Sequence, residues 1–229
     1  MINHYRQQEI EHTIKDRGLL YPIDVLVVGA TGTGKSSTIN ALMNSVVAIV
    51  GQGVDPETQM ISSHSLHKYL RFHDSAGLGD GIESDKRHSK AIIEKLCQPC
   101  TVNGQQYGFI DLVLVILDGG SRDLGTVMQL LEHVVMKNIS ADRVVVAINQ
   151  ADVAMKGRHW QQDLKRPDPI LAQYLEQKAH SVQQRLRDST GRTIALPTCY
   201  SAYHGYQLPQ LMDSLISHFP HQRRVLPIS

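Results

Sequence analysis

The sequence predicts an α/β domain built around a mainly parallel sheet. Segments rich in apolar and β-branched residues recur along the 229-residue chain, and helical patterns separate them. The best of these segments are nearly continuous in apolar residues, which indicates strands that are covered on both faces. A glycine-rich loop, GATGTGKS, joins the first strand to the first helix that follows it. This combination favours a P-loop NTPase fold with three α/β/α layers.

Taken in order, four apolar segments are expected to be strands, and the stretch Ser65–Asp74 is expected to form two poorer strands or one bent ribbon. The four strands are Ile23–Val28, Phe109–Leu117, Arg143–Ile148 and Thr193–Cys199. Helical spacing predicts four helices between and after them. These are Lys35–Asn44, Asp85–Cys97, Asp123–Met136 and Leu208–Phe219.

Two further segments lie outside this alternation. Leu171 to Leu186 follows helical spacing with charged residues between the apolar ones, which predicts an amphipathic helix, and Tyr5–Lys15 predicts a helix with a thin apolar stripe. The polar stretch Met155–Pro169 is expected to be a surface loop, and its Trp160 either marks a partner site or covers the long helix. The expected organisation is a helical extension over 1–20, one domain over 21–220 and a tail over 221–229.

The composition favours a soluble protein in a reducing, cytoplasmic setting. Apolar residues make up 41% of the chain, which suffices for a sizeable core. Basic and acidic side chains number 23 and 22, and no long basic block occurs, so no nucleic-acid binding is expected. No apolar run is long enough for a transmembrane segment, and the first residues lack the apolar region of a signal peptide. The three cysteines (Cys97, Cys100 and Cys199) do not resemble a disulfide framework or a zinc site.

The loop after the first strand carries the phosphate-binding pattern G-x-x-x-x-G-K-S. Glycines let backbone N–H groups converge on phosphate oxygens, and the start of the helix adds the positive end of its dipole. Lys35 is expected to reach the β- and γ-phosphates, and the Ser36 hydroxyl is a hard oxygen ligand for Mg²⁺. The expected nucleotide-binding residues of the loop are Gly29, Thr31, Gly32, Thr33, Gly34, Lys35, Ser36 and Ser37. A turn that merely joins strand to helix is the disfavoured alternative.

A second motif, N-x-x-D, is expected to recognise guanine. Asn149 and Asp152 follow the strand Arg143–Ile148, at the sheet edge where α/β proteins bind ligands. A carboxylate can accept hydrogen bonds from both N1–H and the 2-amino group of guanine, whereas a plain helix cap is the alternative for this motif. Ser201 and Ala202 follow the last strand, where a backbone N–H can donate to the guanine 6-oxo group. The pair of motifs disfavours an ATPase or a kinase.

A third motif, D-x-x-G, is expected to sense the γ-phosphate. Asp74 would hold Mg²⁺ through water, and the Gly77 N–H would meet the γ-phosphate at the start of a flexible, glycine-rich segment. Upstream, Thr58 is a candidate second Mg²⁺ ligand, with an ordinary polar loop as the alternative. The predicted metal ligands are therefore Ser36, Thr58 and Asp74.

These motifs, in this order, resemble those of the translation-factor-class GTPases of the Era and septin branch, and in particular the bacterial GTP-binding proteins of the YfjP and YeeP type. The resemblance covers about residues 20 to 220 and rests on GATGTGKSS, DPETQ, DSAGLGDG, SRDLGT, NQAD and YSA. It implies a G domain with a six-stranded sheet that binds GTP or GDP with Mg²⁺. Gln150 stands where the family has a lysine that packs on the base, which predicts a lower affinity for guanine.

Hydrolysis is expected to be slow. In Ras-like relatives a glutamine after the D-x-x-G glycine orients the attacking water, but here the residue is Leu78, which has no polar group. The resemblance assigns catalysis to Lys35, Thr58 and Gly77, with Glu57, Gln59 and Arg122 as weaker candidates. The expected function is a GTP-binding switch with slow GTPase activity; the alternative is a module that dimerises on GTP or GDP and turns over little. Its expected partner is a second copy or an effector protein.

Overall fold

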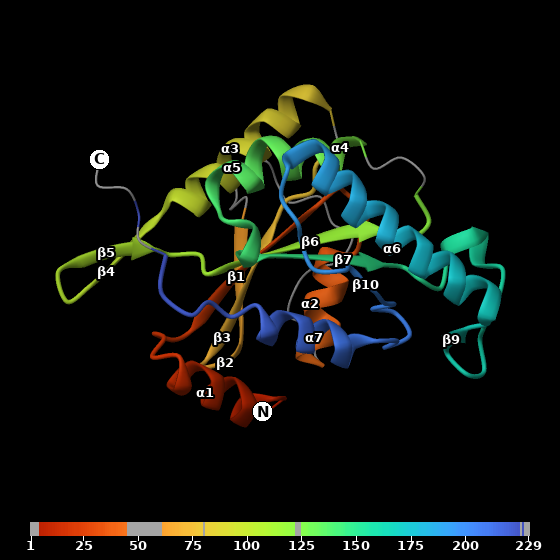
Figure 1. Cartoon of the computed structure of the whole chain (residues 1–229), viewed down its shortest axis with the longest axis horizontal. Helices are drawn as coiled ribbons and strands as arrows, with labels where there is room; N and C mark the ends of the chain where they lie inside the picture. Colours follow the sequence, from red (N-terminus) through yellow and green to blue (C-terminus); the bar gives the residue numbers. More distant parts are fainter. Residues whose placement is uncertain (1–4, 45–60, 80, 122–124, 225, 227–229) are drawn as a thin grey trace.

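The computed structural model describes residues 5–44, 61–79, 81–121, 125–224 and 226. Within these residues a six-stranded sheet forms the centre of the molecule, with the strand order β10-β7-β6-β1-β3-β2 (Figure 1). Neighbouring strands are parallel except β2 and β3, which are antiparallel. The strands are β1 (Ile23–Gly29), β2 (Ile61–His67), β3 (Leu70–Ser75), β6 (Leu112–Asp118), β7 (Val144–Asn149) and β10 (Thr198–Cys199). The predicted sheet is confirmed, and Ser65–Asp74 belongs to two strands.

Strand β1 shows why the central strands are almost continuous in apolar residues. All seven of its residues are buried. Val25 and Val27 belong to one hydrophobic cluster, whereas Leu26 and Val28 belong to another. Because successive side chains of a strand point to opposite faces, a strand that is covered on both faces needs an apolar residue at nearly every position.

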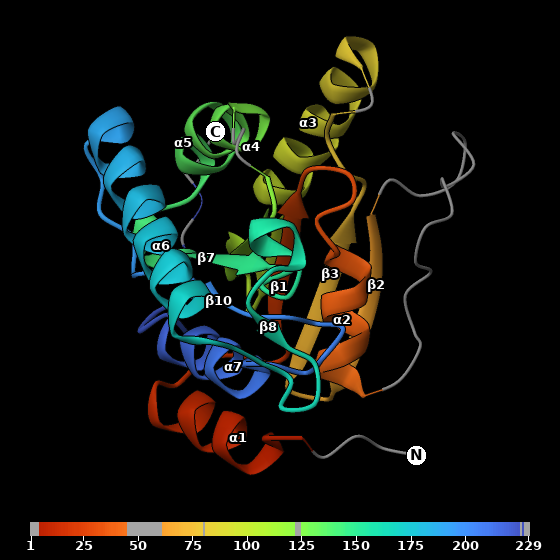
Figure 2. The same cartoon turned by 90° about the vertical axis from the view of Figure 1, so that its right-hand side faces the viewer.

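Helices cover both faces of the sheet and complete the three layers (Figure 1 and Figure 2). On one face lie α1 (Gln7–Asp16), α2 (Lys35–Met43) and α7 (Leu208–Ser217). The other face is covered by α3 (Ile82–Cys97), α4 (Gly125–Leu130), the π-helical turn η1 (Leu131–Val135), α5 (Met136–Asn138) and α6 (Pro169–Thr190). The predicted α/β/α layering is therefore confirmed, and each carboxyl end of a parallel strand opens onto the same edge of the sheet.

The long helix α6 has the amphipathic pattern that the sequence predicts. Asp168 caps its start by accepting hydrogen bonds from two backbone N–H groups of the first turn, and Gly191 ends it with a φ of 66°. The apolar positions predicted for its buried face are buried except Tyr174, which is partly buried. Before it, the expected surface loop is in fact a 3₁₀ turn (Ala154–Gly157) and a hairpin of β8 (Trp160–Gln161) with β9 (Arg166–Pro167). Trp160 is only 8% exposed in the described structure and packs on α6, so it covers that helix.

A second hairpin lies directly before the segment predicted as the strand Phe109–Leu117, where no element is predicted. The expected strand Phe109–Leu117 begins at Leu112, because Phe109 donates its N–H to Gln98 O and lies at the base of this hairpin. The hairpin pairs β4 (Pro99–Val102) with β5 (Gln105–Gly108) around an Asn-Gly turn, and Asn103 has a φ of 50°. Asn-Gly between two short strands is a strong hairpin signal, which the sequence analysis overlooked.

The helix predicted over Asp123–Met136 is not one regular helix. The structure describes it from Gly125 onward and changes to π-helical turns at Leu131 before α5 ends at Asn138. The wider turn places Leu131, Val134 and Val135 together in the interior. Strand β10 is also shorter than predicted, because only Thr198 and Cys199 pair with β7.

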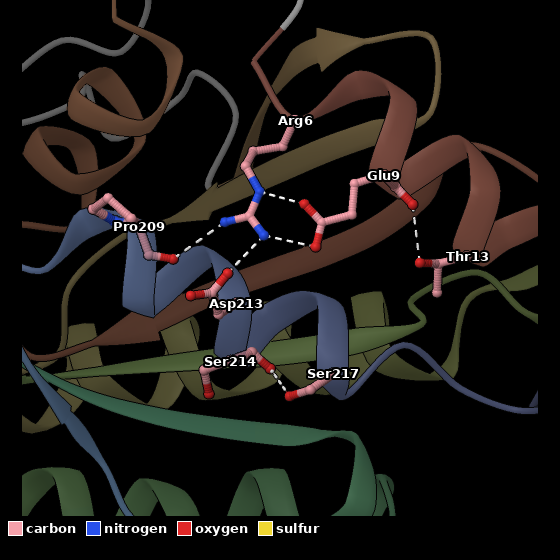
Figure 3. Close-up of polar contacts among 7 residues, drawn as sticks. All are labelled: Arg6, Glu9, Thr13, Pro209, Asp213, Ser214 and Ser217. Atoms are coloured by element: carbon pink, nitrogen blue, oxygen red, sulfur yellow. Dashed lines mark hydrogen bonds and ion pairs between the residues drawn. The ribbon is translucent and has the colours of Figure 1, made fainter.

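The N-terminal helix α1 packs on α7 rather than standing apart from the domain. Ile10 and Ile14 are buried in the same hydrophobic cluster as the sheet. Figure 3 shows Arg6 between the two helices, where its guanidinium binds Glu9 of α1 and Asp213 of α7, at 2.5 Å and 2.6 Å. The apolar contacts bury α1, and the ion pairs set its position along α7.

Candidate functional site

The glycine-rich loop curls between β1 and α2, with Lys35 beneath it. The Lys35 side chain is 7% exposed, and Nζ donates to Gly29 O and Ala30 O at 3.3 Å and 3.0 Å. Gly34, directly before the helix, has a φ of 84°, and a Cβ on it would lie 2.4 Å from Nδ2 of Asn149. Only glycine therefore fits this position, and Lys35 lies at the first turn of α2, where the backbone N–H groups favour an anion.

Ser36 and Asp74 meet at the start of α2. Ser36 Oγ donates to Asp74 Oδ2 at 2.6 Å, although the two residues are far apart in the sequence. The other carboxylate oxygen of Asp74, Oδ1, is buried and has no hydrogen-bond partner among the described residues. Burial raises the pKa of Asp74 above its ordinary value, while the hydrogen bond from Ser36 opposes that shift. A buried carboxylate oxygen without a partner beside a hydroxyl suits a hard cation such as Mg²⁺, which binds one or two protein oxygens together with phosphate oxygens.

The segment after Asp74 lies directly against the phosphate loop. Leu78 donates its N–H to Gly29 O at 3.3 Å, and Thr31 donates its N–H to Leu78 O at 2.7 Å. A Cβ on Gly77 would lie 2.5 Å from Oγ1 of Thr31, so the backbone of D-x-x-G approaches the loop more closely than another residue would allow. Leu78 itself is 5% exposed and packs in the core, so its side chain offers nothing to a bound nucleotide.

Asn149 joins the phosphate loop to the loop after β10. Its side chain is buried at the end of β7, where Nδ2 donates to Thr33 O at 3.0 Å and Oδ1 accepts the N–H of Ala202 at 3.0 Å. Next to it, Gln150 Nε2 donates to Gly32 O at 2.8 Å. The side chains of Asn149 and Gln150 therefore hold backbone carbonyls of the phosphate loop in place.

Asp152 and Ser201 lie beside this junction. Asp152 is backed by His204, whose Nε2 is 3.9 Å from Oδ2 of Asp152, and its side chain is 13% exposed. Ser201 is buried, and its Oγ accepts the N–H of His204 at 3.2 Å. The ring of His204 in turn packs on Trp160, with ring centroids 5.1 Å apart. The N-x-x-D and Ser201–Ala202 motifs thus lie side by side at the carboxyl edge of the sheet.

Several predicted site residues cannot be placed relative to these. Thr58, Glu57, Gln59 and Arg122 lie outside the described residues, so their expected roles remain predictions. The described part of the chain contains no group of three or more His, Cys, Asp or Glu side chains arranged to hold a metal ion. None of its helices combines the length and the apolar composition needed to cross a bilayer.

The structure adds supporting residues that sequence reasoning missed. Tyr200 is buried and its hydroxyl lies 2.7 Å from Oγ1 of Thr38, which ties α2 to the residue just before Ser201. His88 Nδ1 lies 2.6 Å from Gly77 O, and so links α3 to the D-x-x-G glycine. These contacts join residues far apart in the sequence, and no local pattern marks them.

Lys178 of α6 is a further residue of this kind. Its Nζ donates to three backbone oxygens at the end of β6 and in the loop after it, those of Asp118, Gly119 and Ser121, at distances of 2.7 to 3.1 Å. Burial lowers the pKa of Lys178 from its ordinary value. Lys178 therefore fixes the start of the SRDLGT segment to the helix, although its place in the amphipathic pattern of α6 predicts only a solvated charge.

Comparison with known proteins assigns this arrangement to a family. Residues 24–179 match the sequence pattern of a family described as 50S ribosome-binding GTPase. The chain belongs to this family of GTPases. The predicted GTP binding and GTP hydrolysis are thereby confirmed as the activities of its family, and the matched range includes the phosphate loop, D-x-x-G and N-x-x-D motifs.

Among curated proteins, the GTPase is 27% identical over 153 residues to the tRNA modification GTPase MnmE of Sulfurovum sp. (strain NBC37-1). That match covers 64% of this chain but only 30% of MnmE, so the GTPase corresponds to under a third of that relative.

Two solved structures support the fold of the GTPase. Toc33 from Arabidopsis thaliana in complex with GDP and Mg²⁺ is similar with a TM-score of 0.63 and 13% identity, over 97% of this chain and 93% of Toc33. A structure of the chloroplast translocon components atToc33 and psToc159, for which dimerization is described as important for the GTPase activity, is similar with a TM-score of 0.64 and 14% identity, over 99% and 94%. The predicted G-domain fold is confirmed by these similarities.

Proposed function

We propose that the chain is a guanine-nucleotide switch that binds GTP or GDP with Mg²⁺ and hydrolyses GTP slowly by itself. The observation that carries this proposal is the meeting of Ser36 and Asp74, with one oxygen of Asp74 buried and without a partner among the described residues. When bound, Mg²⁺ neutralises charge on the β- and γ-phosphate oxygens. Ser36 and Asp74 would hold it, together with Thr58.

The glycine-rich loop and Lys35 bind the phosphates of the nucleotide. Backbone N–H groups of the glycine-rich loop would converge on the phosphates, and Lys35 adds a buried positive charge. Its hydrogen bonds to Gly29 O and Ala30 O fix the direction of the side chain. A phosphate oxygen would therefore gain a charge-assisted hydrogen bond from Lys35.

Asp152 recognises the guanine base, and Asn149 and Gln150 hold the neighbouring loops in place. Asp152 is partly exposed at the edge of the site and can accept from N1–H and the 2-amino group of guanine. Gln150 keeps the contact to the phosphate loop but is shorter than lysine, so it covers less of the base and predicts weaker binding. Ser201 and Ala202 shape the loop beside the 6-oxo group, and Asn149 holds Ala202 in register.

Slow hydrolysis follows from Leu78. Its buried, apolar side chain cannot orient water, so positioning of the attacking water is left to backbone groups of Thr58 and Gly77 or to a partner. We expect intrinsic turnover on the order of 10⁻⁴ to 10⁻² s⁻¹, as in unassisted Ras-like proteins.

The alternative function is a module that dimerises on GTP or GDP and turns over little. The specific observation in its favour is again Leu78, and the described importance of dimerization for Toc33 GTPase activity gives it a parallel. Under this alternative, the partner is a second copy of the chain that binds through its G domain. Under the switch function, the partner can equally be an effector protein.

The finer assignments are part of the same proposal. The motif set supports the Era and septin branch and, within it, the YfjP and YeeP type. The proposed domain limits are 21–220 for the G domain, with 1–20 and 221–229 as its flanking segments. The three free cysteines support a reducing, cytoplasmic location.

Single-turnover GTP hydrolysis at increasing protein concentration tests the proposal and separates the two functions. A slow rate that stays constant supports the switch, and a rate that rises with concentration supports assembly-activated catalysis. No turnover at any concentration favours the dimerising module. Rapid turnover by a dilute monomer would contradict both.

A further inference from the structure

A hollow of about 440 Å³ lies at the edge of the sheet opposite the nucleotide site. It is lined by residues of the segment 140–143, which precedes β7, and of the C-terminal segment 221–224. The phosphate loop follows the carboxyl end of β1, at the other edge of the sheet (Figure 1). Its charged lining consists of Arg143, Arg223 and Arg224, against a single carboxylate, that of Asp142, and His221 also lines it. The hollow is therefore strongly basic in a chain whose net charge is close to zero.

The arginines of this hollow bind neutral acceptors. Arg143 Nη1 donates to the backbone oxygen of Asp111 at 3.3 Å. Arg224 donates to the backbone oxygens of Asn138, at 3.0 Å, and of Leu96. In the described part of the chain, none of the three guanidiniums forms an ion pair with a carboxylate within 4.0 Å. Their charges are thus held close together, and the carboxyl group of Asp111, which interacts electrostatically with all three, lies beyond ion-pair distance.

Burial makes this arrangement unfavourable. Burial lowers the pKa of both Arg143 and Arg224, and the charge of Arg143 lowers that of Arg224 further. The Nε atoms of Arg223 and Arg224 are buried and have no hydrogen-bond partner among the described residues. A nearby anion would offset the repulsion and provide acceptors, because guanidiniums bind oxyanions through paired N–H groups.

Arg223 is the member best suited to receive a ligand. Among the described residues it makes a long hydrogen-bond contact to Cys100 Sγ, at 3.7 Å, and its guanidinium lies 5.7 Å from the ring centre of Tyr107. Arg143 and Arg224, in contrast, hold the C-terminal segment to the domain through backbone oxygens. Arg223 can therefore turn toward a ligand without releasing that segment.

We propose that this hollow, formed by Arg143, His221, Arg223 and Arg224, is a binding site for a small phosphate-type oxyanion, separate from the nucleotide site. Its volume is within the range of about 300–1,000 Å³ that is usual for small-ligand sites. The ligand is inorganic phosphate or pyrophosphate, or a small metabolite that carries such a group.

The test uses the full chain saturated with GDP and Mg²⁺, so that added phosphate cannot occupy the nucleotide site. The melting temperature is measured in phosphate, in pyrophosphate and in sodium chloride of equal ionic strength, and dissociation constants are obtained by calorimetry. The variant is Arg223→Gln. The matched control is Arg187→Gln, which removes the same charge from an exposed position on α6.

Wild type and R187Q should be stabilised by phosphate or pyrophosphate beyond the effect of chloride. R223Q should bind the anion at least about tenfold more weakly, because it loses a charge-assisted contact, while its GDP affinity stays unchanged. Equal melting temperatures of the wild type in phosphate, pyrophosphate and chloride, or equal anion affinity of R223Q and wild type, would overturn the proposal.

Should R223Q fail to bind GDP, the exposed His221 provides a second variant. His221→Asp adds a negative charge to the rim of the hollow without removing a packed group, and it should also weaken anion binding by about tenfold. Unchanged anion binding by H221D would contradict the proposed site. All these readouts are independent of GTP hydrolysis, so they leave the proposed function of the nucleotide site untouched.

Discussion

Replacement of Asn149 by alanine removes two buried hydrogen bonds that join the phosphate loop to the loop carrying Ala202. The oxygen of Thr33 and the N–H of Ala202 each lose a partner at 3.0 Å. A typical hydrogen bond contributes about 0.5–1.5 kcal/mol net, and a buried group left unpaired costs about 1–3 kcal/mol, so we expect a combined loss of about 2–4 kcal/mol. Because both bonds position nucleotide-binding loops, part of this loss should appear as weaker GDP binding.

Urea unfolding and GDP titration of Asn149→Ala measure the two parts of that loss. Asn138→Ala is the matched control, since it makes the same substitution and removes a part-buried hydrogen bond to Val134 O, away from the nucleotide-binding loops. N138A should lower the free energy of unfolding yet leave GDP affinity near that of wild type. The reasoning would be refuted if N149A kept wild-type GDP affinity, or if N138A lost as much affinity as N149A.

Three further predictions concern single side chains. Lys35→Ala should weaken GDP binding by about 1.5–3 kcal/mol, because it removes a charge-assisted contact, and unchanged affinity in a titration would exclude the loop as the phosphate site. Leu78→Ala should keep the residual hydrolysis rate per folded molecule while losing about 2–5 kcal/mol of stability, since its buried side chain is apolar; loss of that rate would show a catalytic role. Burial raises the pKa of Asp111 from 3.8 to about 6, so the stabilising protonated form is fully present below pH 4 and is lost as pH rises through 6. Asp111→Asn keeps a neutral acceptor for the N–H of Asp24 at every pH. The free energy of unfolding of D111N minus that of wild type should therefore increase between pH 4 and 7, and a constant difference over this range would contradict the raised pKa of Asp111.

The features that the sequence predicts well are those that depend on neighbouring residues. The run IDVLVVG is buried on both faces of the sheet, and the loop after it needs glycine at Gly34 for its backbone angle and its contact with Asn149. Both constraints act over a few residues, so they leave a readable pattern. The ends of α6 are also marked locally, by Asp168 and Gly191, although the sequence analysis predicts only the apolar stripe between them.

The features that the sequence does not predict depend on long-range contacts. Trp160 lies in a polar stretch, and its burial follows only once α6 and the loop after β10 are folded against it. Tyr200 and Lys178 support the site through partners far away in the chain. The Asn103–Gly104 hairpin is different, because its signal is local and was readable.

The central claim is that Asp152 reads guanine at the end of N-x-x-D, and competition binding of GTP, XTP and ATP to wild type and Asp152→Asn tests it most directly. Asparagine turns one acceptor into a donor, so guanine should lose a few kcal/mol of binding, on the order of an unpaired buried polar group. Xanthine carries an oxygen in place of the 2-amino group and should bind the variant better. The account predicts that wild type prefers GTP over ATP, and that D152N loses GTP and gains XTP. The account is contradicted if wild type prefers ATP. It is also contradicted if D152N keeps its GTP affinity, which is the result expected if Asp152 is only a helix cap.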